Sequence, residues 1–231
     1  MVVDNITLLL IDGDEELTSF QHVMNPGLRE KVTVNGHPTF LTHNKRKTTI
    51  KTYWAEPIVG TMELIEHVSN LFGIHVKKVA IKPNWGTRLM NWVQQRQGSL
   101  RMVSINSFDS KFESKELKSI IMECEAKYVR MNALHSTPFE IQDLHKAFET
   151  FECLNGTWIT VDNLITLDCI QITVKGKRFT CAEINRVLKH WIQGGSSRLK
   201  VLQLELTEEN DAELFDGLNG EWRNGKTVVY E

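Results

Sequence analysis

The stretch Leu199-Lys-Val-Leu-Gln-Leu204 carries the pattern that decides the fold: apolar residues at the first, fourth and sixth positions. Its alternating tail, Leu-Gln-Leu, has the two-residue period of a β-strand with one face directed inward. The starts of successive copies are 24, 26, 22, 19 and 32 residues apart, an average of about 25 residues, which indicates an irregular repeat. The six copies start at Val76, Leu100, Ala126, Phe148, Leu167 and Leu199.

Segments with helical spacing and N-terminal capping residues lie between these strands. Thr137-Pro-Phe-Glu140 and Thr180-Cys-Ala-Glu183 match the capping box, in which the first and fourth residues satisfy each other's free backbone N–H groups. Gly194-Gly195 ends the last of these helices, because glycine readily adopts the left-handed conformation of a C-cap. The expected helices are capped at Thr61, Thr87, Ser114, Thr137 and Thr180.

Strands that alternate with helices at this spacing predict parallel pairing through crossover connections. We therefore expect an α/β fold, an irregular leucine-rich-repeat-like solenoid with a mainly parallel curved sheet and helices on one side. The asparagine typical of such turns occurs once, at Asn84, so no asparagine ladder is expected. These α/β repeats are expected to occupy residues 59–231.

The first part of the chain, residues 1–58, has a different pattern. Strand-like segments lie at 6–11, 31–34 and 47–53, and Asn35-Gly36 is a turn signal between two of them. An uncovered terminal repeat would leave apolar surface and a strand edge in water. We therefore expect this part to form a β-rich N-terminal cap on the solenoid.

Composition limits the class of protein. With 41% hydrophobic and 24% charged residues, the chain is typical of a globular protein, and its net charge of −2 argues against broad nucleic-acid binding. The N-terminus lacks the basic region of a signal peptide, and no run of residues is long and apolar enough to span a membrane. The four cysteines form no C-x-x-C pair, so they are expected to be reduced. These features predict a cytoplasmic or possibly nuclear protein.

One stretch matches an enzyme signature. Gly220-Glu-Trp-Arg-Asn-Gly-Lys-Thr227 fits the phosphate-binding pattern G-x-x-x-x-G-K-[ST], which would make the chain a nucleotide-dependent enzyme. A working phosphate loop follows a buried strand and opens a helix, whereas here a helix-like acidic segment precedes it and the strand-like stretch 227–230 follows. We interpret it as a turn into a terminal strand. No other catalytic, cofactor-binding or metal-binding pattern is found, so a non-catalytic protein is expected.

The C-terminal part resembles a known family, the type 2 F-box-associated domain of nematode F-box proteins. The resemblance is clearest over residues 148–218. Two of the matching residues, Trp158 and Trp191, are expected to pack inward. The family motif is carried by Trp158, Leu164, Ile170, Ile172, Thr180, Asn185, Leu188, Trp191, Gly194, Leu199 and Leu202.

This resemblance implies a substrate-recognition subunit of a Skp–cullin–F-box ubiquitin ligase. In such proteins an N-terminal F-box docks on the Skp-type adaptor, and the associated domain holds the protein to be ubiquitinated. Holding the substrate raises its effective concentration near the conjugating enzyme. The leucine- and proline-rich F-box segment is not found in this sequence, so the Skp-type adaptor and the cullin are expected partners only where an F-box is present. Truncation, or loss of adaptor binding in a competitor of full-length relatives, would explain its absence.

A second hypothesis is a solenoid protein that binds other proteins without any link to ubiquitin. Both hypotheses place an unknown protein partner on an extended surface, the sheet face or the loops along one edge. Neither implies a cofactor, nucleic acid or membrane. From strand alternation, the outward candidates are Lys78, Lys82, Arg101, Ser104, Lys127, Arg130, Gln171, Thr173, Lys200 and Gln203.

Overall fold

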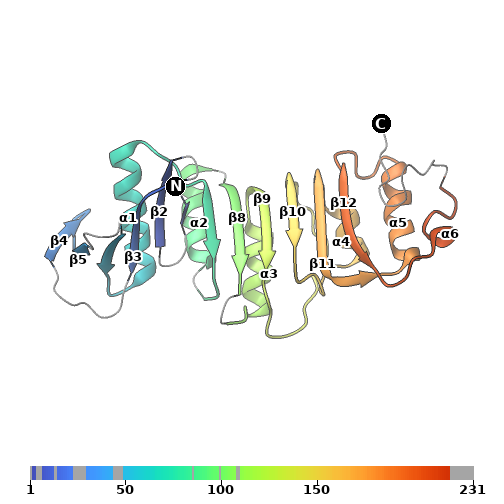
Figure 1. Cartoon of the computed structure of the whole chain (residues 1–231), viewed down its shortest axis with the longest axis horizontal. Helices are drawn as coiled ribbons and strands as arrows, with labels where there is room; N and C mark the ends of the chain where they lie inside the picture. The colour runs from blue at the N-terminus through green and yellow to red at the C-terminus, as the bar shows by residue number, and fades with distance from the viewer. Residues whose placement is uncertain are drawn as a thin grey trace.

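The protein is a mixed α/β structure built on one long sheet (Figure 1). The computed structural model describes residues 2–3, 7–12, 15–22, 30–43, 49–84, 86–98, 100–107 and 110–218. The strands in these ranges lie in the order β12-β11-β10-β9-β8-β7-β1-β2-β3-β6-β5-β4. The helices line up behind the strands in Figure 1, so they cover one face of the sheet, and no helix of the described ranges covers the other.

Six consecutive strands form the parallel part of the sheet. Each pairs in parallel with the next one in sequence, which confirms the expected strand–crossover–strand arrangement. All six copies of the sequence pattern contribute a strand. The strands are β7 Lys78–Ile81, β8 Leu100–Asn106, β9 Ala126–Asn132, β10 Thr150–Cys153, β11 Gln171–Phe179 and β12 Val201–Leu206.

The core lies between this sheet and its helices. Val79, Val103, Val129, Phe151 and Ile172 form one buried row of paired residues across the strands. The aligned Leu202 is half-buried in the last strand. Each strand thus buries alternate side chains against the helices, as the two-residue period requires.

The register corrects one copy of the repeat. Phe151 pairs with Ile172, not with Ile170, so the fifth copy starts at Cys169 and not at Leu167. The segment from Leu167 onward satisfies the apolar pattern in two registers, two residues apart. Ile170 is consequently half-buried ahead of β11, whereas Ile172 is buried in the core.

The N-terminal strands continue the same sheet. The expected strands at 31–34, 49–53 and 7–11 are confirmed; residues 6, 47 and 48 lie outside the described ranges. Asn35 and Gly36, with φ of 48° and 85°, form the turn of the β4–β5 hairpin. β1 pairs in parallel with β7 and antiparallel with β2, joining the two parts. The strands are β1 Val2–Val3, β2 Thr7–Asp12, β3 Glu15–His22, β4 Glu30–Val34, β5 His37–His43 and β6 Thr49–Tyr53.

The helix ends show which capping signals act. In α5 both bonds of the Thr180–Glu183 capping box are present, as expected. At the other end, Gly194 has φ of 85°, and the Gly195 N–H donates to His190 O over 3.0 Å, which satisfies a terminal carbonyl. No helix within the described ranges combines the length and the apolar character needed to cross a membrane. The helices are α1 Pro57–Phe72, α2 Gly86–Gln97, α3 Ser114–Glu123, α4 Val161–Thr166, α5 Cys181–Ile192 and α6 Asp211–Leu214.

Three expected caps are wrong, because Thr61, Thr87 and Ser114 lie within helices. α1 begins at Pro57, a residue suited to the first helical turn because its missing N–H would have no partner there. Gly60 follows in that turn because the Trp54 ring packs against it: a Cβ there would lie 2.1 Å from the ring. Inside the helix, the Thr61 hydroxyl donates to Pro57 O over 3.0 Å.

The helix expected after Thr137 is also wrong. Residues 133–149 form no helix, and Asp143 adopts the left-handed conformation, with φ of 54°. Ile141 and Leu144 are buried, but by an irregular chain. The Ile141 carbonyl accepts from Asn163 Nδ2 over 2.6 Å, a side-chain bond that replaces a helical one.

Candidate interaction surface

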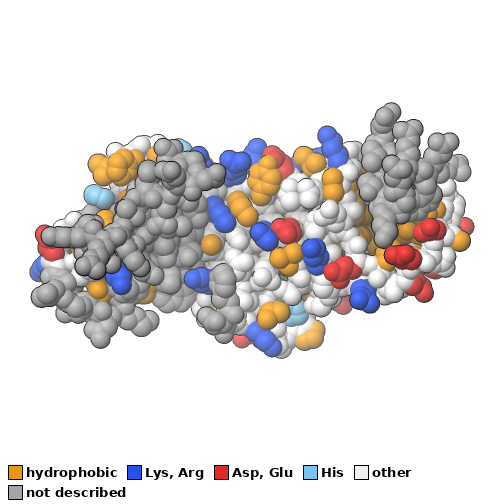
Figure 2. All heavy atoms as spheres, in the orientation of Figure 1, with side chains coloured by type: hydrophobic (Ala, Val, Ile, Leu, Met, Phe, Trp, Pro, Cys, Tyr) orange, Lys and Arg blue, Asp and Glu red, His pale blue; other side chains and the backbone are white. Residues whose placement is uncertain are grey.

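The side of the parallel sheet that no described helix covers is the candidate interaction surface, and we call it the open face. Parallel sheets are usually covered on both faces. Here Figure 1 shows helices on one side, and the visible side in Figure 2 is the strand side. The first row of the open face is Lys78, Met102, Tyr128, Thr150, Gln171 and Val201. The second row is Ala80, Ser104, Arg130, Glu152, Thr173 and Gln203.

Polar pairs cross between strands in the second row. Arg130 Nε lies 3.2 Å from Glu152 Oε2, and the side chains are 51% and 31% exposed. The Thr173 hydroxyl donates to Gln203 Oε1 over 3.0 Å. An exposed ion pair of this kind contributes about 0–1 kcal/mol, so the open face is polar without being a major source of stability.

Most of the expected outward side chains are accessible. Arg101, Lys127, Arg130, Lys200 and Gln203 are exposed, and Lys78, Lys82 and Gln171 are half-buried. Ser104 and Thr173 are the exceptions, because they are 6% and 5% exposed. Both lie in an outward row, but Ser104 Oγ accepts from Asn106 and Thr173 donates to Gln203, so longer neighbours cover these two short side chains.

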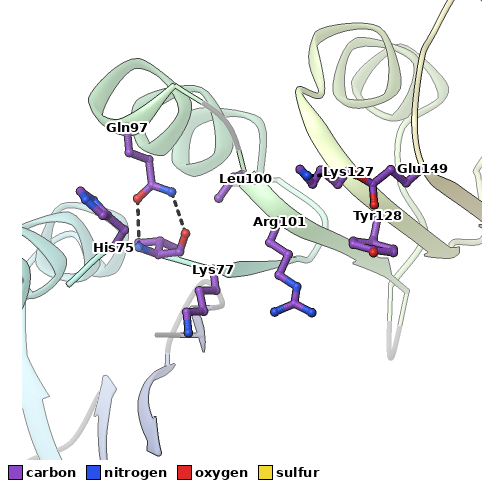
Figure 3. Close-up of a pocket in the computed structure, with 9 residues that line it drawn as sticks. His75, Lys77, Gln97, Leu100, Arg101, Lys127, Tyr128 and Glu149 are labelled. Atoms are coloured by element: carbon purple, nitrogen blue, oxygen red, sulfur yellow. Dashed lines mark hydrogen bonds and ion pairs between the residues drawn. The ribbon is translucent and has the colours of Figure 1, made fainter. Parts of the chain in front are cut away.

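A depression of about 470 Å³ lies at the edge of the sheet where β7, β8 and β9 begin (Figure 3). Lys127 Nζ lies 3.0 Å from Glu149 Oε1. The Lys127 ammonium and the Tyr128 hydroxyl hold the pKa of Glu149 below its usual range by hydrogen bonding to the carboxylate. The depression is lined by His75, Val76, Lys77, Gln97, Leu100, Arg101, Lys127, Tyr128 and Glu149.

The residues of the family motif lie behind the sheet or in the last strands. Trp158, Leu164, Ile172 and Leu199 are buried in the core. Leu188, Trp191 and Leu202 pack against the core while partly exposed. These positions are structural locations, and their role as a motif stays a prediction.

The polar residues of that motif hold chain ends. Thr180 caps α5 and Gly194 follows it. Asn185 Nδ2 donates to the carbonyls of Leu214 and Asp216, each over 2.9 Å. Asn185 therefore attaches the segment after β12 to α5.

Sequence reasoning missed Asn163, which is 1% exposed in α4. Its side-chain oxygen accepts from Thr160 N over 3.0 Å, and its Nδ2 bonds the Ile141 carbonyl. Asn163 thus completes a capping box with Thr160 and holds the irregular 133–149 segment. The Thr-x-x-Asn spacing was a signal, but the usual box has Glu or Gln at the fourth position.

The four cysteines are all buried, and three of their thiols have raised pKa values. Burial raises the pKa of the Cys124 and Cys153 thiols to about 12 and that of Cys169 to about 11. Among the described residues, no group of three or more His, Cys, Asp and Glu side chains is placed to hold a metal ion. The phosphate-loop match at 220–227 and the strand expected at 227–230 lie outside the described residues.

The fold and the surface define an α/β protein with an open, polar sheet face. Residues 140–204 match the family model described as F-box associated, which confirms the family recognised in the sequence for this segment. The chain is also similar to a Caenorhabditis elegans protein described as Skn-1 dependent zygotic transcript 15 protein, with 21% identity over 187 residues. That similarity covers 76% of this chain and 54% of the relative, so the chain spans about half the length of the curated relative it matches. No solved structure matches the chain.

Proposed function

We propose that the chain is a non-catalytic protein-interaction module that recognises substrates for a Skp–cullin–F-box ubiquitin ligase. The observation that carries this proposal is the open face, where parallel strands present polar and charged side chains while helices cover the opposite side (Figures 1 and 2). The family match at 140–204 supports the link to F-box proteins.

In this proposal the six parallel strands are the repeats of an irregular leucine-rich-repeat-like solenoid over residues 59–231. Residues 1–58 form its β-rich cap. Neighbouring strands lie about 4.8 Å apart, so a broad sheet presents side chains at regular intervals to a protein partner. The module performs no bond chemistry: it holds the substrate and thereby raises its effective concentration near the ligase, in the cytoplasm or nucleus.

The test joins the F-box of a nematode relative to the N-terminus of the full chain and identifies co-purified proteins by mass spectrometry. We expect the Skp-type adaptor, the cullin and a set of further proteins whose ubiquitination depends on the fusion. Captured proteins that are never ubiquitinated would favour a binding protein unconnected to ubiquitin. Absence of the adaptor and cullin from the fusion would contradict the proposal.

A pair of variants assigns capture to the open face. Thr150→Arg/Gln171→Arg places two bulky cations side by side in the first row of the open face. Gln95→Arg/Ala182→Arg adds the same charge at exposed positions on α2 and α5 and serves as the matched control. Loss of the further proteins in the open-face variant, with adaptor binding retained in both, is the expected result. Equal capture of the further proteins by both variants would show that the open face is not the binding surface.

A further inference from the structure

Three basic residues lie near the starts of neighbouring strands, and we call Lys77, Arg101 and Lys127 the basic row. Lys77 directly precedes β7, and Arg101 and Lys127 are the second residues of β8 and β9. Their successors are paired across the sheet: Lys78 with Met102, and Met102 with Tyr128. The backbone confirms the alignment at one end, because Met102 N–H donates to Lys77 O over 3.0 Å. Neighbouring strands are about 4.8 Å apart, so three cationic side chains start within about 10 Å along this edge.

Two members of this row have no anionic partner in the described part of the chain. Lys77 and Arg101 are exposed, and neither forms an ion pair with any described residue. Their side chains extend to the same side in Figure 3. Like charges this close repel one another, so the basic row slightly lowers the free energy of unfolding of the isolated protein. An anionic partner would reduce this repulsion.

We infer that the basic row docks an acidic segment, rich in Asp and Glu, of a protein partner. This inference rests on the proposed function and names the chemistry of the substrate. Charge complementarity supports it, because Lys77 and Arg101, which form no ion pair with a described residue, lie in a depression of about 470 Å³ that also offers the half-buried Tyr128 for apolar contact. The cations are distributed along an edge, which suits several carboxylates of an extended chain.

Glu149 limits one end of the row. Its carboxylate pairs with the Lys127 ammonium over 3.0 Å, so Lys127 is less available to a ligand. The negative charge of Glu149 also repels an acidic ligand. Replacing Glu149 by Gln keeps the shape of the side chain and removes its charge. Binding of an acidic segment should therefore become tighter in this variant.

The test measures fluorescence anisotropy of a labelled peptide of alternating Glu and Ser residues with the full chain at low salt. Lys77→Glu/Arg101→Glu should raise the Kd at least about 10-fold, and Glu149→Gln should lower it about 3-fold. The matched control is Lys115→Glu/Lys118→Glu, two exposed residues on α3, which changes net charge equally and should alter the Kd less than about 2-fold. A peptide of Gln and Ser should not bind.

Three outcomes of the peptide measurement would overturn the inference. They are equal weakening by the control variant, no binding of the acidic peptide, and binding restricted to a Gln-Ser peptide with one phosphoserine, which would assign the row to phosphate. Capture of partners that survives Lys77→Glu/Arg101→Glu but is lost in Thr150→Arg/Gln171→Arg would overturn this inference and leave the proposed function intact.

Discussion

The side-chain amide of Gln97 forms two hydrogen bonds with the backbone of Val76. Val76 N–H donates to Gln97 Oε1 over 2.9 Å, and Gln97 Nε2 donates to Val76 O over 2.6 Å. Gln94, one turn earlier in α2, bonds the next loop in the same way, through Glu125 N and Glu123 O. Side-chain amides of α2 therefore hold the loops that lead into β7 and β9, the strands on either side of β8, without an asparagine ladder.

We expect Gln97→Ala to lower the free energy of unfolding by about 1–3 kcal/mol, because it leaves two part-buried backbone groups without a partner. Gln95→Ala is the matched control, since Gln95 is exposed in the same helix, and should change stability by less than about 0.5 kcal/mol. Urea unfolding followed by circular dichroism measures both. Equal effects of the two substitutions would show that the Val76 bonds are not stabilising.

Asn185→Ala should loosen the segment that follows β12. Its Nδ2 donates to two carbonyls, of Leu214 and Asp216, so we expect a loss of about 1–2 kcal/mol and faster amide exchange across residues 207–218. Hydrogen exchange with mass spectrometry reads this segment directly. Arg186→Ala, which removes the exposed ion pair with Asp162, should leave exchange there unchanged. Unaltered exchange in Asn185→Ala would refute the attachment.

Stability should fall at alkaline pH through Cys153. Burial raises the pKa of its thiol from 9.0 to about 12 in the folded state. The contribution is therefore fully present below pH 9 and is lost as the pH rises toward 12, because the unfolded chain ionises first. Above pH 9, the unfolding free energy of the wild type should fall more steeply than that of Cys153→Ala, by up to about 1.4 kcal/mol per pH unit. Parallel pH profiles would contradict a buried, protonated thiol.

The strands of the parallel sheet were predictable because their apolar pattern is local. Alternation in Val79–Ile81 and Val103–Ile105 is visible in the sequence and matches the buried row. The Thr180 box was predictable for the same reason, since its two residues are three positions apart.

The parts of the fold that were predicted wrongly depend on contacts between distant segments. The irregular course after Thr137 is held by Asn163, more than 20 positions away, and local helix signals cannot report that bond. The choice between Leu167 and Cys169 as a repeat start requires the pairing of Ile172 with Phe151. Competing local patterns were decided by tertiary structure in both cases.

The surface residues were likewise predictable where a local pattern decides them, but not where contacts between strands do. Arg101 and Lys127 were expected to be outward and are exposed, although each lies two positions before a residue of the buried row. Their alignment with Lys77 appears once the register of β7, β8 and β9 is known. The exposure of Ser104 was misjudged because a neighbouring side chain, Asn106, covers it. The direction of a side chain can be predicted from the sequence more readily than the neighbouring side chains that cover it.

The most direct measurement is the affinity of one captured, ubiquitinated partner for purified variants, by isothermal titration calorimetry. Thr150→Arg/Gln171→Arg should weaken binding at least about 10-fold, because it obstructs the centre of the open face, and Gln95→Arg/Ala182→Arg should stay within about 2-fold of the wild type. Circular dichroism melts establish that both variants are folded. Unchanged affinity in the open-face variant, or loss confined to the helix-face variant, would contradict recognition by the open sheet.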